Sequence, residues 1–282
     1  MKYIKEKNKI IIKDLTDFNI NQIFDCGQIF RYWINQNDAS CVSTDKFAKI
    51  KTFQDRVEIH SLDIDYFENF FDLKTNHSKI KERLSKDSFL KPCCAFGYGI
   101  RILRQNLFEM LISFIVSANN NIKRIKNSLN YLAENFGEKK VGIDNSCYFA
   151  FPTLRNLKTA TVEDYKKAGL GYRAEYMFDT VQKLTDETIS NFKNLTTDQQ
   201  YKFLLSLKGV GEKVANCVML FSSFDFCSFP VDTWIHKVYN HITKSNEQNR
   251  KIIMNIFKDK YEKLSGYAQQ YFFYYYRENK LI

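Results

Sequence analysis

The chain has 282 residues and a formal net charge of +10 at pH 7. Its hydrophobic content of 44% and aromatic content of 16% exclude a disordered chain and are typical of a folded protein with a sizeable core. No apolar run is long enough to span a membrane. The excess of basic over acidic residues favours a polyanionic partner. Ribosomal and membrane-surface proteins share this excess.

The N-terminal ninety residues favour strands. A β-branched run at 9–13 and a period-two alternation at 56–60 predict strands, and connecting helices are expected at about 64–90. Proline and glycines interrupt the periodicity at 91–99, which we interpret as a domain boundary. We therefore predict an antiparallel β domain with connecting helices over residues 1–98.

Beyond this boundary the pattern becomes helical. Apolar residues at 103–115 and 122–132 each fall on one helix face, and the second helix is expected to end at Phe136-Gly137. A polar interruption, Asn119-Asn120-Asn121, separates the two helices. The fold class predicted is α+β, with the N-terminal antiparallel sheet packed on a mainly helical domain over 99–282.

The segment 207–213 (LKGVGEK) predicts a tight hairpin that opens a helix. Gly209 and Gly211 allow a sharp turn whose backbone N–H groups approach an anion, most naturally a DNA phosphate. Lys213 falls on the first helical turn, where the helix dipole favours a neutral, nucleophilic amine. Asp232 stands at a predicted helix N-cap further along. This pairing suggests covalent chemistry on a nucleic acid; the alternatives are a phosphate contact for Lys213 and a plain helix cap for Asp232.

Cysteine usage gives no sign of a metal site. Seven cysteines have no paired ligand spacing, and the adjacent Cys93 and Cys94 are poor joint ligands for one tetrahedral ion. Their odd number, with no signal peptide, predicts reduced thiols inside a cell.

Five motifs in order resemble the 8-oxoguanine DNA glycosylase/AP lyase family of the helix-hairpin-helix superfamily. They are the hairpin with Asp232, and the segments 26–31 (CGQIFR), 117–124 (SANNNIKR), 169–174 (GLGYRA) and 266–269 (GYAQ). The resemblance covers nearly the whole chain and implies a helix-hairpin-helix at about 199–222. It implies no organic cofactor and allows a monovalent cation at the hairpin. No cysteine follows Cys227, so the iron–sulfur cluster of endonuclease III-like relatives is excluded.

The resemblance implies a bifunctional enzyme that excises 8-oxoguanine, and formamidopyrimidine purines, from duplex DNA. Lys213 would attack the anomeric carbon, expel the damaged base and form a Schiff base, from which β-elimination cleaves the strand. Asp232 would stabilise the charge on the sugar or orient the amine.

A base pocket is implied by four matching positions and one departure from the family pattern. Cys217 and Phe273 would sandwich the flipped purine, and Gln269 would hydrogen-bond its Watson–Crick edge. The Gly27 carbonyl would accept from N7–H, which ordinary guanine lacks. Phe221 stands where a methionine often lines the pocket. Without the resemblance, Cys217 and Phe273 would be assigned to the core and Gly27 to a turn or bulge.

Further matches concern the DNA around the lesion. Asn119 would fill the gap left by the base, Arg124 and Arg173 would contact the orphaned cytosine, and Tyr172 would act as a wedge beside it. Arginines that contact only phosphates are the alternative, and they would give no opposite-base preference. The family's phosphate-binding histidine is replaced by Trp234.

We expect a monomer that binds double-stranded DNA containing an oxidised purine and makes no membrane contact. We expect it in the cytoplasm of a bacterium or archaeon, or in the nucleus of a eukaryote. Two other functions remain open: a glycosylase of the same fold for another damaged base, and a non-catalytic DNA-damage-binding protein, which would have no reason to pair Lys213 with Asp232.

Overall fold

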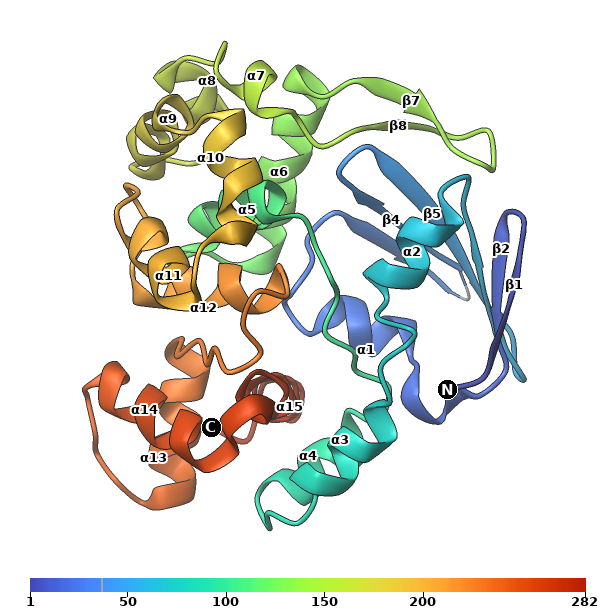
Figure 1. The fold of residues 1–282 in the computed structure, drawn as a ribbon, viewed down its shortest axis with the longest axis vertical. Coiled ribbons are helices and arrows are strands. Elements are labelled where there is room, and N and C mark those ends of the chain that lie inside the picture. The colour runs from blue at the N-terminus through green and yellow to red at the C-terminus, as the bar shows by residue number, and fades with distance from the viewer. Residues whose placement is uncertain (37) are drawn as a thin grey trace.

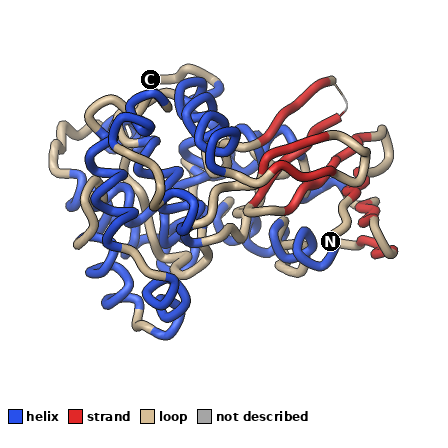
Figure 2. The backbone as a smooth tube through the Cα atoms, turned by 90° about the horizontal axis from the view of Figure 1, so that it is seen from above, coloured by secondary structure: helices blue, strands red, loops and turns tan. Residues whose placement is uncertain are grey.

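An antiparallel sheet forms the N-terminal part of the molecule (Figures 1 and 2). The structure is a computed structural model that describes residues 1–36 and 38–282. Within these residues, the strands in sheet order are β1 (Tyr3–Glu6), β2 (Lys9–Ile12), β6 (Val57–His60), β5 (Lys46–Thr52), β4 (Asp38–Ser43) and β3 (Tyr32–Asn35). The strands predicted at 9–13 and 56–60 are confirmed as β2 and β6, which are neighbours.

The register of the sheet gives it one apolar face. Ile10, Ile59 and Ile50 are paired across three strands and are fully buried. Because alternate residues of a strand point to the same face, this row marks the side that carries the core. Phe24 of α1 (Ile20–Asp25) and Phe67 of α2 (Ile64–Phe70) pack into the same core.

The segment predicted as a domain boundary contains a helix. After α3 (His77–Leu84) comes α4 (Leu90–Phe96), which includes Pro92. The proline lies in the first turn, where backbone N–H groups have no intrahelical partner, so it does not interrupt the helix. α4 packs against α15 (Ser265–Glu278) from the far end of the chain. The exact limits 1–98 and 99–282 stay a prediction.

A helical body forms the rest of the chain and confirms the predicted α+β class. At its centre, α5 (Leu107–Ser117) contacts α6 (Ile122–Phe136), α9 (Arg173–Lys183) and α12 (Glu212–Phe221). The other helices are α7 (Leu154–Leu157), α8 (Val162–Lys167), α10 (Asp186–Asn191), α11 (Thr197–Leu205), α13 (Thr233–Thr243) and α14 (Arg250–Tyr261). Three 3-10 turns span Leu15–Asp17, Phe192–Asn194 and Glu262–Leu264. None of the helices described combines the length and apolarity that crossing a bilayer requires.

A small hairpin, β7 (Lys139–Val141) and β8 (Cys147–Phe149), was not predicted. It reaches from the helical body toward the N-terminal sheet (Figure 1). Tyr148 stacks on Phe47, with ring centroids 5.2 Å apart, and its hydroxyl donates to the Asp45 carbonyl at 2.7 Å. The hairpin therefore joins the two parts of the molecule.

Candidate active site

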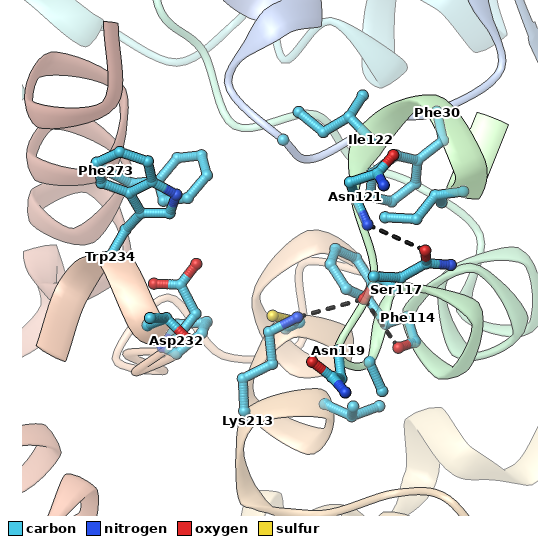
Figure 3. A pocket seen from close by; sticks show the side chains of 18 of the residues that line it. Phe30, Phe114, Ser117, Asn119, Asn121, Ile122, Lys213, Asp232, Trp234 and Phe273 are labelled. Carbon is cyan, nitrogen blue, oxygen red and sulfur yellow. Dashed lines mark hydrogen bonds between the residues drawn. The ribbon is translucent and has the colours of Figure 1, made fainter. Parts of the chain in front are cut away.

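A cavity of about 910 Å³ lies among the helices, and most of the predicted site residues line it. Its walls come from the α5–α6 loop, the hairpin before α12, the starts of α13 and α14, α15, and the turn after α1 (Figure 3). The predicted residues among its lining are Gly27, Asn119, Gly209, Gly211, Lys213, Cys217, Phe221, Asp232, Trp234, Gln269 and Phe273.

In the hairpin between α11 and α12, the backbone requires glycine at Gly209 and does not require it at Gly211. Gly209 has a φ of +77°, and a Cβ there would lie 3.0 Å from the Cβ of Tyr176. Gly211 is the N-cap residue of α12 and has nothing within 4 Å of the place where a Cβ would stand. The turn therefore leaves backbone exposed at a helix N-terminus, a geometry suited to a phosphate.

Lys213 lies on the first turn of α12, and its amine points into the cavity (Figure 3). The Nζ atom donates to Ser117 Oγ at 3.2 Å, and the Ser117 hydroxyl donates to the Phe114 carbonyl at 2.9 Å. The Phe114 ring lies beneath the amine, 5.3 Å from Nζ to the ring centroid. A serine and an aromatic ring thus fix the amine, and no acidic side chain among residues 1–36 and 38–282 forms an ion pair with it.

Asp232 lies on the opposite wall and caps α13 (Figure 3). Its Oδ1 accepts from the Ile235 N–H at 2.8 Å. Burial raises the pKa of this carboxyl above its ordinary value, although the cap hydrogen bond and the charges of Lys213 and Arg250 oppose the rise. Asp232 both caps α13 through Oδ1 and lines the cavity, so the two roles weighed from the sequence are compatible.

The base-pocket candidates lie together. Cys217 is one turn after Lys213, and burial raises the pKa of its thiol to about 11, so it is a neutral wall group. Gly27 has a φ of +78°, and a Cβ there would lie 3.0 Å from Cε1 of Phe273. The Gln269 Oε1 accepts from Gln270 Nε2 at 2.8 Å. These residues leave a slot with a thiol, a ring, an amide and a glycine backbone at its walls.

Phe221 and Trp234 are the two departures from the family pattern. Phe221 is buried and stacks on Phe114, with ring planes 13° apart. Trp234 is partly exposed at the cavity wall near Asp232 (Figure 3). Phe221 therefore supports the Phe114 ring beneath Lys213. Trp234 offers an apolar surface with one N–H donor.

The residues predicted to contact the opposite strand lie at the cavity edge or outside it. Asn119 is exposed and has a left-handed φ of +49°. The Arg173 guanidinium is buried and donates to the carbonyls of Ala118 at 2.5 Å and Asn119 at 2.6 Å. Arg124 is exposed, and Tyr172 is 56% exposed. In this structure Arg173 supports the loop that carries Asn119, and contact of either arginine with cytosine stays a prediction.

Among the cavity residues that sequence reasoning missed are Ser117, Arg250, Gln270 and Arg277, which carry polar groups. Ser117 stands in a motif quoted above, so its proximity to Lys213 could have been considered. Gln270 and Arg277 follow Gln269 on α15 with no spacing that distinguishes them from core or surface positions.

This fold and site are those of a base excision DNA repair protein of the helix-hairpin-helix class. The HhH-GPD superfamily model matches residues 112–263, and the model of the 8-oxoguanine DNA glycosylase N-terminal domain matches residues 10–111. The chain belongs to the 8-oxoguanine DNA glycosylase family.

Individual relatives agree with this placement. The 8-oxoguanine glycosylase/lyase of Clostridium acetobutylicum, in complex with double-stranded DNA that has cytosine opposite 8-oxoG, is 35% identical with a TM-score of 0.93, covering 100% of this chain and 99% of that one. The N-glycosylase/DNA lyase OGG1 of Arabidopsis thaliana is 32% identical over 62% of this chain, and the match spans 51% of that protein. A probable N-glycosylase/DNA lyase of Methanothermobacter thermautotrophicus is 28% identical over 76% of this chain and 75% of its own length.

Proposed function

We propose that this chain is a bifunctional DNA glycosylase/AP lyase that flips 8-oxoguanine out of duplex DNA, excises it and then cleaves the strand. The observation that carries the proposal is the placement of Lys213 and Asp232 on opposite walls of one cavity, which has room for a flipped base. Family membership and the names of the relatives support the same reaction.

The chemistry follows from the two side chains. The unprotonated Lys213 amine attacks C1′ of the sugar, and the C1′–N9 bond breaks with its electron pair leaving on the base, which takes up a proton. The ionised Asp232 carboxylate stabilises the positive charge that develops on the sugar. Ring opening gives a protonated imine, which acidifies C2′–H; loss of that proton expels the 3′ phosphate by β-elimination.

Selection of the base takes place in the part of the cavity that Gly27, Cys217 and Phe273 line. A flipped purine stacks on the Phe273 ring and against the Cys217 thiol, while Gln269 binds its Watson–Crick edge. The Gly27 carbonyl accepts from N7–H of 8-oxoguanine, and it faces a bare lone pair in guanine. The discrimination available from one such pairing is roughly 1–3 kcal/mol. Ring-opened formamidopyrimidine purines keep an N–H in that region and are included in the proposal.

The remaining parts of the proposal concern partners and place. The protein acts as a monomer on double-stranded DNA without an organic cofactor, because Lys213 supplies the covalent chemistry. Its compartment is the one that holds the chromosome, which is the cytoplasm in a bacterium or archaeon and the nucleus in a eukaryote.

Borohydride trapping tests this function directly. Reduction converts a lysine–sugar imine into a permanent cross-link, which we expect with duplexes that contain 8-oxoguanine and not with undamaged duplexes. Lys213→Gln removes the nucleophile and should abolish the cross-link, while lesion binding persists. Tight lesion binding by the wild-type chain without any cross-link would instead support a non-catalytic damage-binding protein. A cross-link only with another damaged base would support a different glycosylase.

A further inference from the structure

Arg277 joins two parts of the cavity wall that come from opposite ends of the sequence. It lies in the last turn of α15 and donates through Nη2 to the carbonyl of Asp25, the last residue of α1. Asp25 stands two residues before Gly27. The guanidinium therefore attaches the turn that carries Gly27 to the helix that carries Phe273.

The same guanidinium contacts the Phe273 ring. Its Cζ lies 4.9 Å from the ring centroid, within the range of a cation–π interaction. Nε donates to the Glu278 carboxylate at 2.8 Å, which limits rotation of the guanidinium plane. A Cβ added to Gly27 would lie 3.0 Å from Phe273 and 3.9 Å from Arg277 Nη1, so all three groups meet at one place.

The hydrogen bonds of Arg277 differ from those of Arg101, an arginine buried in the core. Arg101 is fully buried and donates to the carbonyls of Phe71, Asp17, Asp72 and Thr75. By contrast, Arg277 Nη1 is buried without a hydrogen-bond partner among the described residues. An unpaired donor is costly, and the buried Arg31 also has unpaired donors at Nε and Nη1, so Arg277 shares this feature with one other arginine among the described residues. Arg277 is placed by its contacts with the turn and the ring rather than by full pairing.

We propose that Arg277 is a positioning residue for base recognition, which holds the Gly27 turn against the edge of the Phe273 ring. This inference rests on the proposed function, since both groups face the flipped purine. With the turn and the ring fixed relative to each other, a flat purine stacks on the Phe273 ring while its N7–H reaches the Gly27 carbonyl. Without Arg277, the turn after α1 and the last turns of α15 separate, and the base loses one contact whenever it makes the other.

The experiment compares two activities of the same chain. One is the single-turnover release of 8-oxoguanine opposite cytosine, which needs the slot. The other is cleavage of a preformed abasic duplex, which needs Lys213 but has no base to place. For Arg277→Met we expect the ratio of the first rate to the second to fall on the order of 100-fold, the effect of misplacing a reacting group by about 1 Å.

Two further variants make the test specific. In Arg277→Lys the ratio should fall less, because an ammonium group reaches the Asp25 carbonyl but does not lie flat on the ring. Arg56→Met is the matched control: Arg56 also stacks on a phenylalanine, 4.0 Å from Cζ to the Phe53 centroid, and donates through Nε to Glu58, on the β5–β6 turn remote from the cavity. Its ratio should equal that of the wild type.

An unchanged ratio in Arg277→Met would overturn the proposal, as would an equal loss of both rates, which indicates general unfolding. A failure of the proposed function looks different. In that case the wild-type chain itself would release no 8-oxoguanine, and no variant would be needed to show it.

Discussion

Lys213 Nζ and Ser117 Oγ lie 3.2 Å apart, although their residues are 96 positions apart in the sequence. Ser117 closes the last turn of α5, where its own hydroxyl proton is directed at the Phe114 carbonyl. The serine oxygen can therefore only accept from the lysine. This orients the amine from the back and leaves its lone pair, once the amine is neutral, directed toward the cavity.

Ser117→Ala should slow the chemical step and leave DNA binding unchanged. A hydrogen bond to a charged or reacting group contributes about 1.5 kcal/mol or more, which corresponds to roughly a tenfold lower rate. The measurement is single-turnover cleavage of abasic DNA, with affinity for lesion DNA followed by anisotropy. Wild-type turnover in the alanine variant would show that Lys213 needs no orientation from α5.

The rate of the enzyme should fall on the acidic side of its pH–rate profile (the acid limb). Because of the Asp232 carboxyl, this fall should occur at a higher pH than an ordinary aspartate would give. Burial raises its pKa, and only the ionised form stabilises the sugar cation, so activity falls as the pH drops through that raised value. The charge of Arg250 opposes the rise; Arg250→Gln should therefore move the acid limb to still higher pH. Arg155→Gln, an exposed arginine on α7, is the control. pH–rate profiles that coincide for all three chains would contradict this coupling.

Gly27→Ala should impair base release more than abasic-site cleavage. The residue has a left-handed φ of +78°, and the new Cβ would stand 3.0 Å from Phe273 Cε1, so the slot narrows and the turn is strained. Excision of 8-oxoguanine and cleavage of abasic duplex are compared in the same preparation. Equal effects on both substrates would place Gly27 outside base recognition.

Local signals were sufficient for the hairpin and for Asp232. The glycines of the turn, Lys213 after it and an N-cap aspartate are features of short segments, and the structure has each of them where the sequence predicted it. Their convergence on one cavity followed from the resemblance, since no single segment of the sequence carries it.

Contacts between distant segments were not predictable in the same way. The residues of the pairs Ser117–Lys213 and Asp25–Arg277 are 96 and 252 positions apart. No periodic pattern in the sequence marks either pair. At Gly137 the position of the helix end was predicted, but the reason for the glycine was not. It ends α6 as expected, but its φ is −90°; glycine is needed because a Cβ would lie 2.1 Å from the Ala150 carbonyl. Ala150 directly follows β8 of the hairpin, which was itself not predicted.

Opposite-base preference should depend differently on the two predicted arginines. Arg124 is exposed, so Arg124→Gln should reduce the preference for cytosine while stability stays constant. Arg173 is buried on the carbonyls of Ala118 and Asn119, so Arg173→Gln should also lower the melting temperature. Excision rates opposite each of the four bases, together with thermal unfolding, measure both effects. An unchanged preference in both variants would assign the arginines to the DNA backbone.

The buried carboxyl of Glu109 should contribute a loss of stability as the pH rises from about 4.5 to about 7, and the buried His77, whose pKa burial lowers to about 4, should oppose it over the same window. Glu109 on α5 accepts from the Thr44 N–H at 2.7 Å and from Ser43 Oγ at 3.2 Å, and burial raises its pKa to about 7. Between its ordinary pKa and this value, the folded protein binds a proton that the unfolded chain has lost. The contribution is therefore complete below pH 4.5 and is lost through pH 7, up to about 3 kcal/mol. Glu109→Gln should remove this loss, so that the unfolding free energy, measured by urea titration, rises more steeply or falls less steeply with pH in this window than in the wild type. An equal slope in the variant and the wild type would show that Glu109 is ionised in the folded protein throughout this range.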